Sequence, residues 1–392
     1  MTSTRGDTED LSRSVGVDWK AAWDFILDRT RANAAAFGDR LPHATVDGRY
    51  VFLEDGGWAG GFWNGILNLA YAKTGDAFFL KSQRSSWPRY LRRLAHPEQW
   101  SDNDIGHFFV PSFVADFTLT GFDRSRDIAL QAAALQCRSF HARGGFIQNW
   151  PVWTPGDAFS EENPGRMIID TMYNLPLLFW AHAQTGDETF KTVALTHART
   201  SAQFLVRPDG TTFHTYVFDP ESGRPKYGRT HQGFRDDSCW ARGQAWAIGG
   251  FSMAHRFHPD PVLLDAARRC ADMFLRHILP GGVVRWDFAL DGDAAEPIDT
   301  SASAIAANGL LLLAPQVDAE AAAVYRRQAA GIAETLFAHH STRDDPRHQG
   351  LLRHGCGHRP ENRNVDASLI YGDYFFVELI ARLSGQAVAW WK

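Results

Sequence analysis

The chain has few cysteines and no apolar segment near its start. Its four cysteines, Cys137, Cys239, Cys270 and Cys356, lie far apart among 392 residues and form no Cys-x-x-Cys pair. We interpret them as free, reduced thiols, which suits the cytoplasm better than a secreted disulfide scaffold. The first residues, MTSTRGDTEDLSRSVG, are polar and lack the apolar core of a secretory signal.

Long apolar runs and basic clusters are also missing. A membrane-spanning helix needs roughly 18 consecutive apolar residues, and no stretch of this sequence approaches that length. The formal net charge is -5, with Lys and Arg scattered along the chain, so the basic stripe of a nucleic-acid-binding protein is absent. We therefore expect a cytoplasmic protein, monomeric or homodimeric, with neither a nucleic-acid nor a membrane partner.

Almost nothing in the sequence has the pattern of a β-strand, whereas helical patterns recur along the whole chain. We expect twelve helices, over residues 17–37, 60–74, 76–95, 105–120, 127–143, 167–185, 188–206, 238–257, 261–279, 300–314, 319–340 and 365–383. After the first helix, two types alternate. One is apolar nearly all round and carries Gly, Trp, Asn or Asp at its start, as a buried helix does, and the other is amphipathic.

Short turns separate several of these helices. Thr74-Gly75-Asp76, Thr120-Gly121-Phe122-Asp123 and Thr185-Gly186-Asp187 each offer a Gly that can end one helix and an Asp that can begin the next. Six inner helices surrounded by six outer ones form an (α/α)6 toroid, and this is the all-α fold that we predict. Because no low-complexity linker interrupts the chain, we expect a loosely packed or disordered segment over 1–16 and a single domain over 17–392.

The chain is rich in tryptophan, with 14 Trp beside 27 Phe. Many of the Trp stand near Gly, Pro and Asp rather than within apolar runs. Trp offers a flat apolar face and one N–H donor, a combination that suits the binding of sugar rings as well as the filling of a core.

The stretch DDSCWARGQAW, residues 236–246, combines unusual residue types at the start of a predicted inner helix. Asp237 or Ser238 is expected to cap the helix. Arg242 and Trp246 are four residues apart and share one face, while Trp240 can join them only at the mouth of the helix. A buried Arg is costly unless it meets an anion, and a carboxylated sugar would supply the anion together with a ring.

Two aspartates are candidates for acid–base chemistry. Asp170 lies near the start of a predicted apolar helix, after Ile168 and Ile169, where burial should raise its pKa as a general acid requires. Asp104 also stands at the start of an inner helix, in SDNDIGHFF, and there helix capping explains it equally well.

Several of these segments resemble a known family. GFWNGILNLAY, RMIIDTMYNLPLLFWAHAQTGD, FHTYVFDPESG, THQGFRDDSCWARGQAW and DYFFVELIARL are similar to segments of the unsaturated glucuronyl hydrolases, glycoside hydrolase family 88. The resemblance implies an (α/α)6 barrel that removes a 4,5-unsaturated uronic acid from the non-reducing end of oligosaccharides made by polysaccharide lyases. It also implies that an Asp protonates C4 of the enol ether while water adds at C5, and that the hemiketal then collapses.

The resemblance further implies roles for individual residues. Asp170 matches the family's acid/base and Asp104 its second essential aspartate. The residues expected to bind substrate are Trp58, Phe62, Asn103, Trp150, His214, Gln232, Trp240, Arg242, Trp246 and His358. Arg242, beside Trp246, is expected to bind the uronate carboxylate. No cofactor is implied.

The chain departs from the family's pattern at two places. Where relatives usually have His-Asp-x-Gly-Phe, it has Asn103-Asp104-Ile105-Gly106-His107, and where they often have Ser-Tyr-His, it has Cys356-Gly357-His358. We expect these changes to reshape the rim of the pocket without affecting Asp170. His354, Cys356 and His358 alternate, but no second cluster completes a zinc pattern, and we predict no metal site.

Three other functions are compatible with such a barrel. An unsaturated rhamnogalacturonyl hydrolase would use the same chemistry, although its helix motif tends to read WARGNGW rather than the WARGQAW found here. A sugar epimerase or isomerase would rely on paired histidines instead of paired aspartates. A carbohydrate-binding protein with an inactive barrel would bind an unsaturated oligosaccharide and leave its double bond intact.

Overall fold

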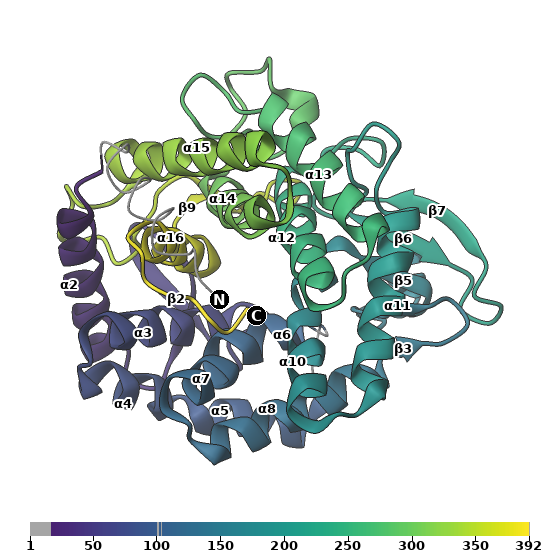
Figure 1. Ribbon diagram of the computed structural model, residues 1–392, viewed down its shortest axis with the longest axis horizontal. Helices are drawn as coiled ribbons and strands as arrows, with labels where there is room; N and C mark the ends of the chain where they lie inside the picture. Colours follow the sequence, from purple (N-terminus) through teal and green to yellow (C-terminus); the bar gives the residue numbers. More distant parts are fainter. Residues whose placement is uncertain (1–16, 100–101, 103, 392) are drawn as a thin grey trace.

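The computed structural model describes residues 17–99, 102 and 104–391. The segment 1–16, Asn103 and the predictions made for them lie outside the described residues. Figure 1 shows the helices arranged as two concentric rings. Within the described residues, no helix is both long and apolar enough to cross a membrane.

The inner ring consists of the helices that the sequence predicts to be buried. Its members are α3 (Gly60–Thr74), α6 (Ile105–Phe109) with α7 (Ala115–Thr120), α10 (Leu175–Thr185), α12 (Ala241–Phe257), α14 (Thr300–Leu313) and α16 (Ile370–Leu383). One π-helical turn, η2 (Val110–Val114), joins α6 to α7. Each inner helix contacts the next, and α16 contacts α3, so the ring is closed.

The outer ring covers these helices with amphipathic ones. It contains α2 (Trp19–Phe37), α4 (Ala77–Ser85), α5 (Trp87–Ala95), α8 (Asp123–Arg138), α11 (Glu188–Phe204), α13 (Pro261–Arg276) and α15 (Ala319–Thr335). The predicted (α/α)6 toroid is thus confirmed. The single helix expected over 76–95 is instead divided at Ser86, where Pro88 opens the first turn of α5.

The turns after α3, α7 and α10 have the predicted form. Gly75, Gly121 and Gly186 end these helices in the left-handed conformation, at φ 69°, 68° and 73°, which glycine adopts without steric cost. Asp76 and Asp187 cap the helices that follow through their side chains. After Gly121, by contrast, the N-cap of α8 is Phe122, and Asp123 is its first helical residue.

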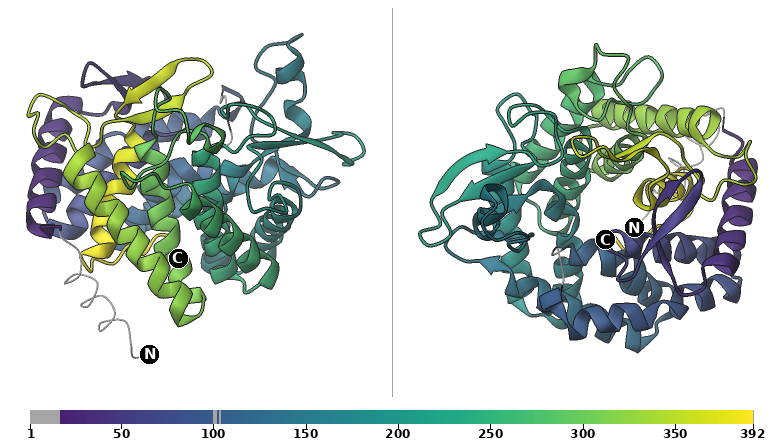
Figure 2. Two further views of the ribbon diagram at one scale, coloured as in Figure 1. Left: turned by 90° about the horizontal axis from the view of Figure 1, so that it is seen from above. Right: turned by 180° about the vertical axis from the view of Figure 1, so that it is seen from behind.

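The sequence predicts almost no strands, and the sheets of the structure are small. Within the residues that the structure describes, nine short strands pair antiparallel in the connections: β1 (Leu41–Val46) with β2 (Arg49–Leu53), β3 (Phe140–His141) with β4 (Phe146–Ile147), β6 (Thr215–Phe218) with both β5 (Arg166–Ile168) and β7 (Pro225–Arg229), and β8 (Gly355–His358) with β9 (Arg363–Ala367). With two to six residues each, they are too short for a periodic pattern. Figure 2 shows the β1–β2 and β8–β9 hairpins at one end of the barrel.

Candidate active site

Asp170 lies in a 3-10 turn, η4 (Ile169–Tyr173), between β5 and α10. The helix expected over 167–185 therefore starts later than predicted, because Arg166, Met167 and Ile168 pair with β6 instead. Asp170 is 8% exposed. Burial first, and the nearby Asp104 carboxylate second, raise its pKa to about 8, although Arg242 and Trp246 act in the opposite direction. Asp170 is thus predominantly protonated at neutral pH, as the sequence predicts for a general acid.

His214, the residue before β6, faces Asp170. Its Nε2 lies 3.6 Å from Asp170 Oδ2. Its Nδ1 accepts hydrogen bonds from the backbone N–H groups of His231 and Gln232, at 3.1 and 3.2 Å. Burial, followed by the nearby His231, holds the pKa of His214 well below its usual value. The imidazole is therefore neutral and carries its proton on Nε2, which lies near the Asp170 carboxyl group but beyond hydrogen-bond distance.

Asp104 precedes α6 at its N-cap position, but its side chain makes no capping hydrogen bond. Instead, Oδ1 accepts hydrogen bonds from the amides of Asn174, at 2.8 Å, and Asn149, at 3.3 Å. Asn174 also accepts a hydrogen bond from the backbone N–H of His107 at 2.8 Å. The capping explanation for the Asp104 side chain is therefore wrong, and a network of amides holds this carboxylate close to Asp170.

His107 lies beneath the site rather than at its rim, which corrects the expectation from the sequence. The side chain is fully buried, and its Nδ1 is 3.5 Å from Asp104 Oδ1. Its ring packs against the rings of Trp246, Phe62 and Trp58, with centroids at 5.0, 5.6 and 5.8 Å. The imidazole therefore fills a space surrounded by aromatic rings, where an apolar ring would also fit.

Arg242 is fully buried and already paired. Its Nη1 donates to Asp299 Oδ2 at 2.8 Å and to the carbonyl oxygen of Cys356 at 2.5 Å, while Nη2 donates to the carbonyl oxygen of Gly357 at 2.6 Å. Asp299 also caps α14 by accepting the N–H of Ser301. The protein itself thus supplies, in Asp299, an anion of the kind that the sequence led us to expect from a substrate. Binding of a uronate by Arg242 stays a prediction.

The predicted aromatic residues divide into a floor and walls. Phe62 and Trp246 are fully buried and form the floor with His107. Trp240 is the N-cap of α12, at the helix mouth as predicted, and its ring lies 4.5 Å from both the His214 ring and the Arg242 guanidinium. The remaining walls come from Trp58, which packs on Tyr371 at 4.7 Å, and from Trp150, which packs edge-on against His214 at 5.7 Å.

The other polar residues of 236–246 form hydrogen bonds and ion pairs within the protein. Neither Asp237 nor Ser238 caps α12, because Asp237 pairs with Arg235 on the surface and Ser238 donates a hydrogen bond to the buried Asp287. Gln244 donates to the backbone carbonyls of Gly210 and Cys270. The predicted capping is thus wrong, and the cap position belongs to Trp240.

Gln232 and His358 lie at the open end of the site. Gln232 donates to the carbonyl oxygen of Gly357 at 3.1 Å, which joins the loop before α12 to the β8–β9 hairpin. His358 Nε2 lies 3.2 Å from His231 Nε2. His354 turns away and pairs with Asp366, so the alternating His354, Cys356 and His358 do not converge on one point.

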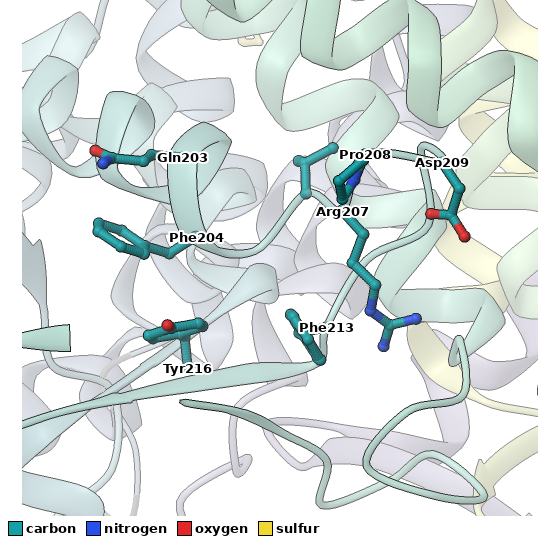
Figure 3. Close-up of a pocket in the computed structure, with 8 residues that line it drawn as sticks. Gln203, Phe204, Arg207, Pro208, Asp209, Phe213 and Tyr216 are labelled. Carbon is teal, nitrogen blue, oxygen red and sulfur yellow. The ribbon is translucent and has the colours of Figure 1, made fainter. Parts of the chain in front are cut away.

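A separate pocket of about 560 Å³ opens beneath β6 on the outside of the barrel, and Figure 3 shows its lining. Phe204, Phe213 and Tyr216 contribute aromatic rings to the lining, and Gln203, Arg207 and Asp209 contribute polar groups. None of the residues that surround Asp170 takes part in it.

Four functional candidates were missed by the sequence interpretation: Asn174, His231, Asp299 and Tyr371. Asn174 and Tyr371 stand at the start of inner helices, as the predicted residues do, so the same positional criterion could have found them. His231 precedes Gln232 in THQG. Asp299 carries no local signal beyond capping, because its ionic partner Arg242 is 57 positions away.

Comparisons with known proteins find relatives that match almost the whole chain. No family model matches the chain. An unsaturated glucuronyl hydrolase from Bacillus sp. (strain GL1) is 38% identical, over 95% of this chain and 98% of the relative. An unsaturated chondroitin disaccharide hydrolase from Streptococcus pyogenes serotype M1 is 32% identical, over 93% of this chain and 91% of the relative.

The solved structures that match this chain include one of the same relatives. The crystal structure of the Bacillus sp. GL1 enzyme superposes with a TM-score of 0.90, over 95% of this chain and 98% of that one. The fold and these relatives define a glycosidase built on a helical barrel. The chain belongs to the unsaturated glucuronyl hydrolase family, as its sequence motifs predict.

Proposed function

We propose that the protein removes a 4,5-unsaturated uronic acid from the non-reducing end of oligosaccharides by hydrating the C4=C5 double bond. The raised pKa of Asp170 is the observation that carries this proposal. An ordinary carboxylate is ionised at pH 7 and has no proton to give, whereas Asp170, with a pKa of about 8, retains one. Among the described residues, this makes Asp170 the best-placed general acid of the site.

In the proposed reaction, Asp170 transfers its proton to C4 of the enol ether and positive charge develops at C5. Water adds at C5, and the Asp170 carboxylate formed in the first step accepts a proton from it. The resulting hemiketal opens and releases the shortened saccharide. The neutral His214 faces the Asp170 carboxyl group at 3.6 Å, while the Asp104 carboxylate stabilises the developing positive charge.

The walls of the site suit a flat, unsaturated ring. We propose that Trp58, Trp150 and Trp240 contact the sugar faces and that Gln232 and His358 bind its hydroxyl groups. Arg242 attracts the uronate carboxylate, and it also holds the Cys356–Gly357 backbone of the β8–β9 hairpin in place. Phe62 and Trp246, which are fully buried, complete the proposed set of substrate-binding residues and lie beneath this surface.

The relatives suggest which saccharides to test. One is described as acting on chondroitin disaccharides, one as responsible for the degradation of glycosaminoglycan, and a third, at TM-score 0.84 and 25% identity, as specific for heparin. We propose substrates of this anionic class, without a cofactor. We also propose one catalytic domain over 17–392, cytoplasmic and monomeric or homodimeric, in keeping with four cysteines that are all free.

Loss of the ultraviolet absorbance of the conjugated double bond tests the proposal. Purified protein would be incubated with unsaturated disaccharides prepared by lyases from chondroitin, heparin and other polysaccharides. We expect at least one to lose absorbance, and Asp170→Asn to reduce the rate by about 10²- to 10⁴-fold. Unchanged absorbance with every disaccharide, or full activity of Asp170→Asn, would contradict the proposed function.

A further inference from the structure

Three side chains with metal-binding atoms meet at the mouth of the site. His231 comes from the loop between β7 and α12, His358 from β8 and Glu361 from the β8–β9 turn. Among the described residues, this is the group of His, Cys, Asp and Glu side chains whose ligand atoms converge closely enough to hold one ion. Of the alternating residues His354, Cys356 and His358, only His358 belongs to this group.

The distances between the donor atoms fit a tetrahedral ion. Two nitrogen atoms bound to one zinc ion stand about 3.3 Å apart, since each Zn–N bond is about 2.05 Å long. His231 Nε2 and His358 Nε2 are 3.2 Å apart, and Glu361 Oε1 lies 3.3 Å from His358 Nε2. The third separation, from Glu361 Oε1 to His231 Nε2, is 4.0 Å. Because the Glu361 side chain is 45% exposed, a small rotation can shorten it.

The protonation of the group favours ligation at neutral pH. Burial and the nearby His358 lower the pKa of His231 to about 4, and burial and the nearby Arg363 lower that of His358 to about 4. Both imidazoles are therefore neutral and need not lose a proton to water. Arg363 contacts Glu361 Oε2 at 3.3 Å and leaves Oε1 to the ion.

One rearrangement is required. His358 Nδ1 accepts a hydrogen bond from the backbone N–H of Glu361 at 3.3 Å, so without an ion the imidazole carries its proton on Nε2. That proton forms the hydrogen bond between His358 Nε2 and His231 Nε2. Ligation moves this proton to Nδ1 and gives up the long hydrogen bond to Glu361. His231 already presents an unprotonated Nε2.

We propose that His231, His358 and Glu361 form a binding site for a divalent transition-metal ion of the Zn²⁺ class, and that its occupation inhibits the enzyme. Two imidazoles and one carboxylate, with a fourth position open to water, are a known zinc ligand set. The ion would join two loops across the mouth, beside the His231 ring that packs on Trp150 at 5.4 Å. Access to Asp170 would then be restricted. The inhibition rests on the proposed function, whereas the metal binding does not.

Cobalt(II) spectroscopy tests the binding directly, on full-length protein from which any histidine tag has been removed. We expect one equivalent of Co²⁺ to give the visible absorption of a tetrahedral complex and to be displaced by Zn²⁺. Glu361→Gln should weaken binding at least tenfold, whereas the control His354→Ala, from the same hairpin, should bind as wild type does. Absence of a tetrahedral spectrum, or equal binding by wild type and Glu361→Gln, would show that His231 and His358 form a hydrogen-bonded pair only.

Inhibition is measured separately with the disaccharide that proves to be the best substrate. We expect Zn²⁺ to inhibit wild type reversibly, with recovery on adding EDTA, and to require at least tenfold more metal for Glu361→Gln. Cobalt binding without zinc inhibition would overturn the inhibitory role alone. An enzyme inactive on every disaccharide would count against the proposed function and leave the cobalt result to stand by itself.

Discussion

At the scale of single residues, the site depends on how Asp170 keeps its proton. Burial and the Asp104 carboxylate raise its pKa, while Arg242 lowers it. The pairing of Arg242 with Asp299 matters here, because a bare guanidinium beside Asp170 would favour ionisation more strongly. The pKa of Asp170 therefore depends on charged residues that lie in α12 or directly before α6 and α14.

The first prediction concerns pH. Because the proposed reaction uses the protonated form of Asp170, we expect kcat to fall as pH rises through about 8. Asp104→Asn removes the second cause of the raised pKa and should move the ionisation of Asp170 to lower pH. Carbon-13 NMR of aspartate-labelled protein measures this, with Asp170→Asn identifying the resonance. The exposed Asp265→Asn serves as control, and an unshifted titration in Asp104→Asn would refute the electrostatic explanation.

The second prediction concerns stability. In the unfolded chain Asp170 ionises near pH 3.8, but in the folded protein only near pH 8. Its contribution to stability is thus fully present below pH 3.8 and is lost as pH rises, by about 1.4 kcal/mol per pH unit, until both states are ionised. The Asp170→Asn variant lacks this ionisation and does not lose stability in this way. The difference in unfolding free energy, variant minus wild type, should therefore increase between pH 4 and 8. Urea denaturation at several pH values measures the gain, and parallel curves would contradict the prediction.

At the scale of elements, the close approach of α6 to the turn before α10 brings the two aspartates together. Gly106 makes this possible, because a Cβ at that position would overlap the backbone of Asn174. Asn174 in turn holds Asp104 and the N–H of His107. Asp373 in α16 accepts hydrogen bonds from Tyr50 and from the N–H groups of Leu351 and Leu352, and so joins α16 to two connecting segments.

The third prediction follows from this contact. Gly106→Ala should push α6 away from Asn174, lower the unfolding free energy by about 1–3 kcal/mol and reduce kcat. Gly331→Ala provides the matched control, since no heavy atom lies within 4 Å of a Cβ there and the residue is exposed in α15. It should raise stability by about 0.5–1 kcal/mol and leave kcat unchanged. Thermal unfolding and steady-state rates check both variants, and a fully active Gly106→Ala would show that the approach is not needed.

At the scale of the whole molecule, the barrel was predictable because alternating buried and amphipathic helices repeat often enough to identify it. The burial of Asp170 and its raised pKa were predictable because a carboxyl group among apolar residues is unusual in any helix. The pairing of Arg242 with Asp299 and the contact of His231 with His358 were not predictable, because they join segments 57 and 127 positions apart. The short strands were missed because their pairing, rather than their sequence pattern, defines them.

The central claim is that the enzyme hydrates a double bond rather than displacing a group at the anomeric carbon. It is tested most directly by a series of aryl glycosides of the unsaturated uronic acid whose leaving groups differ in acidity. Hydration at C4=C5 does not break the anomeric bond in its first steps, so we predict rates nearly independent of leaving-group pKa, all of them lost in Asp170→Asn. Rates that rise steeply as the leaving group becomes more acidic would show direct displacement and contradict the proposed role of Asp170.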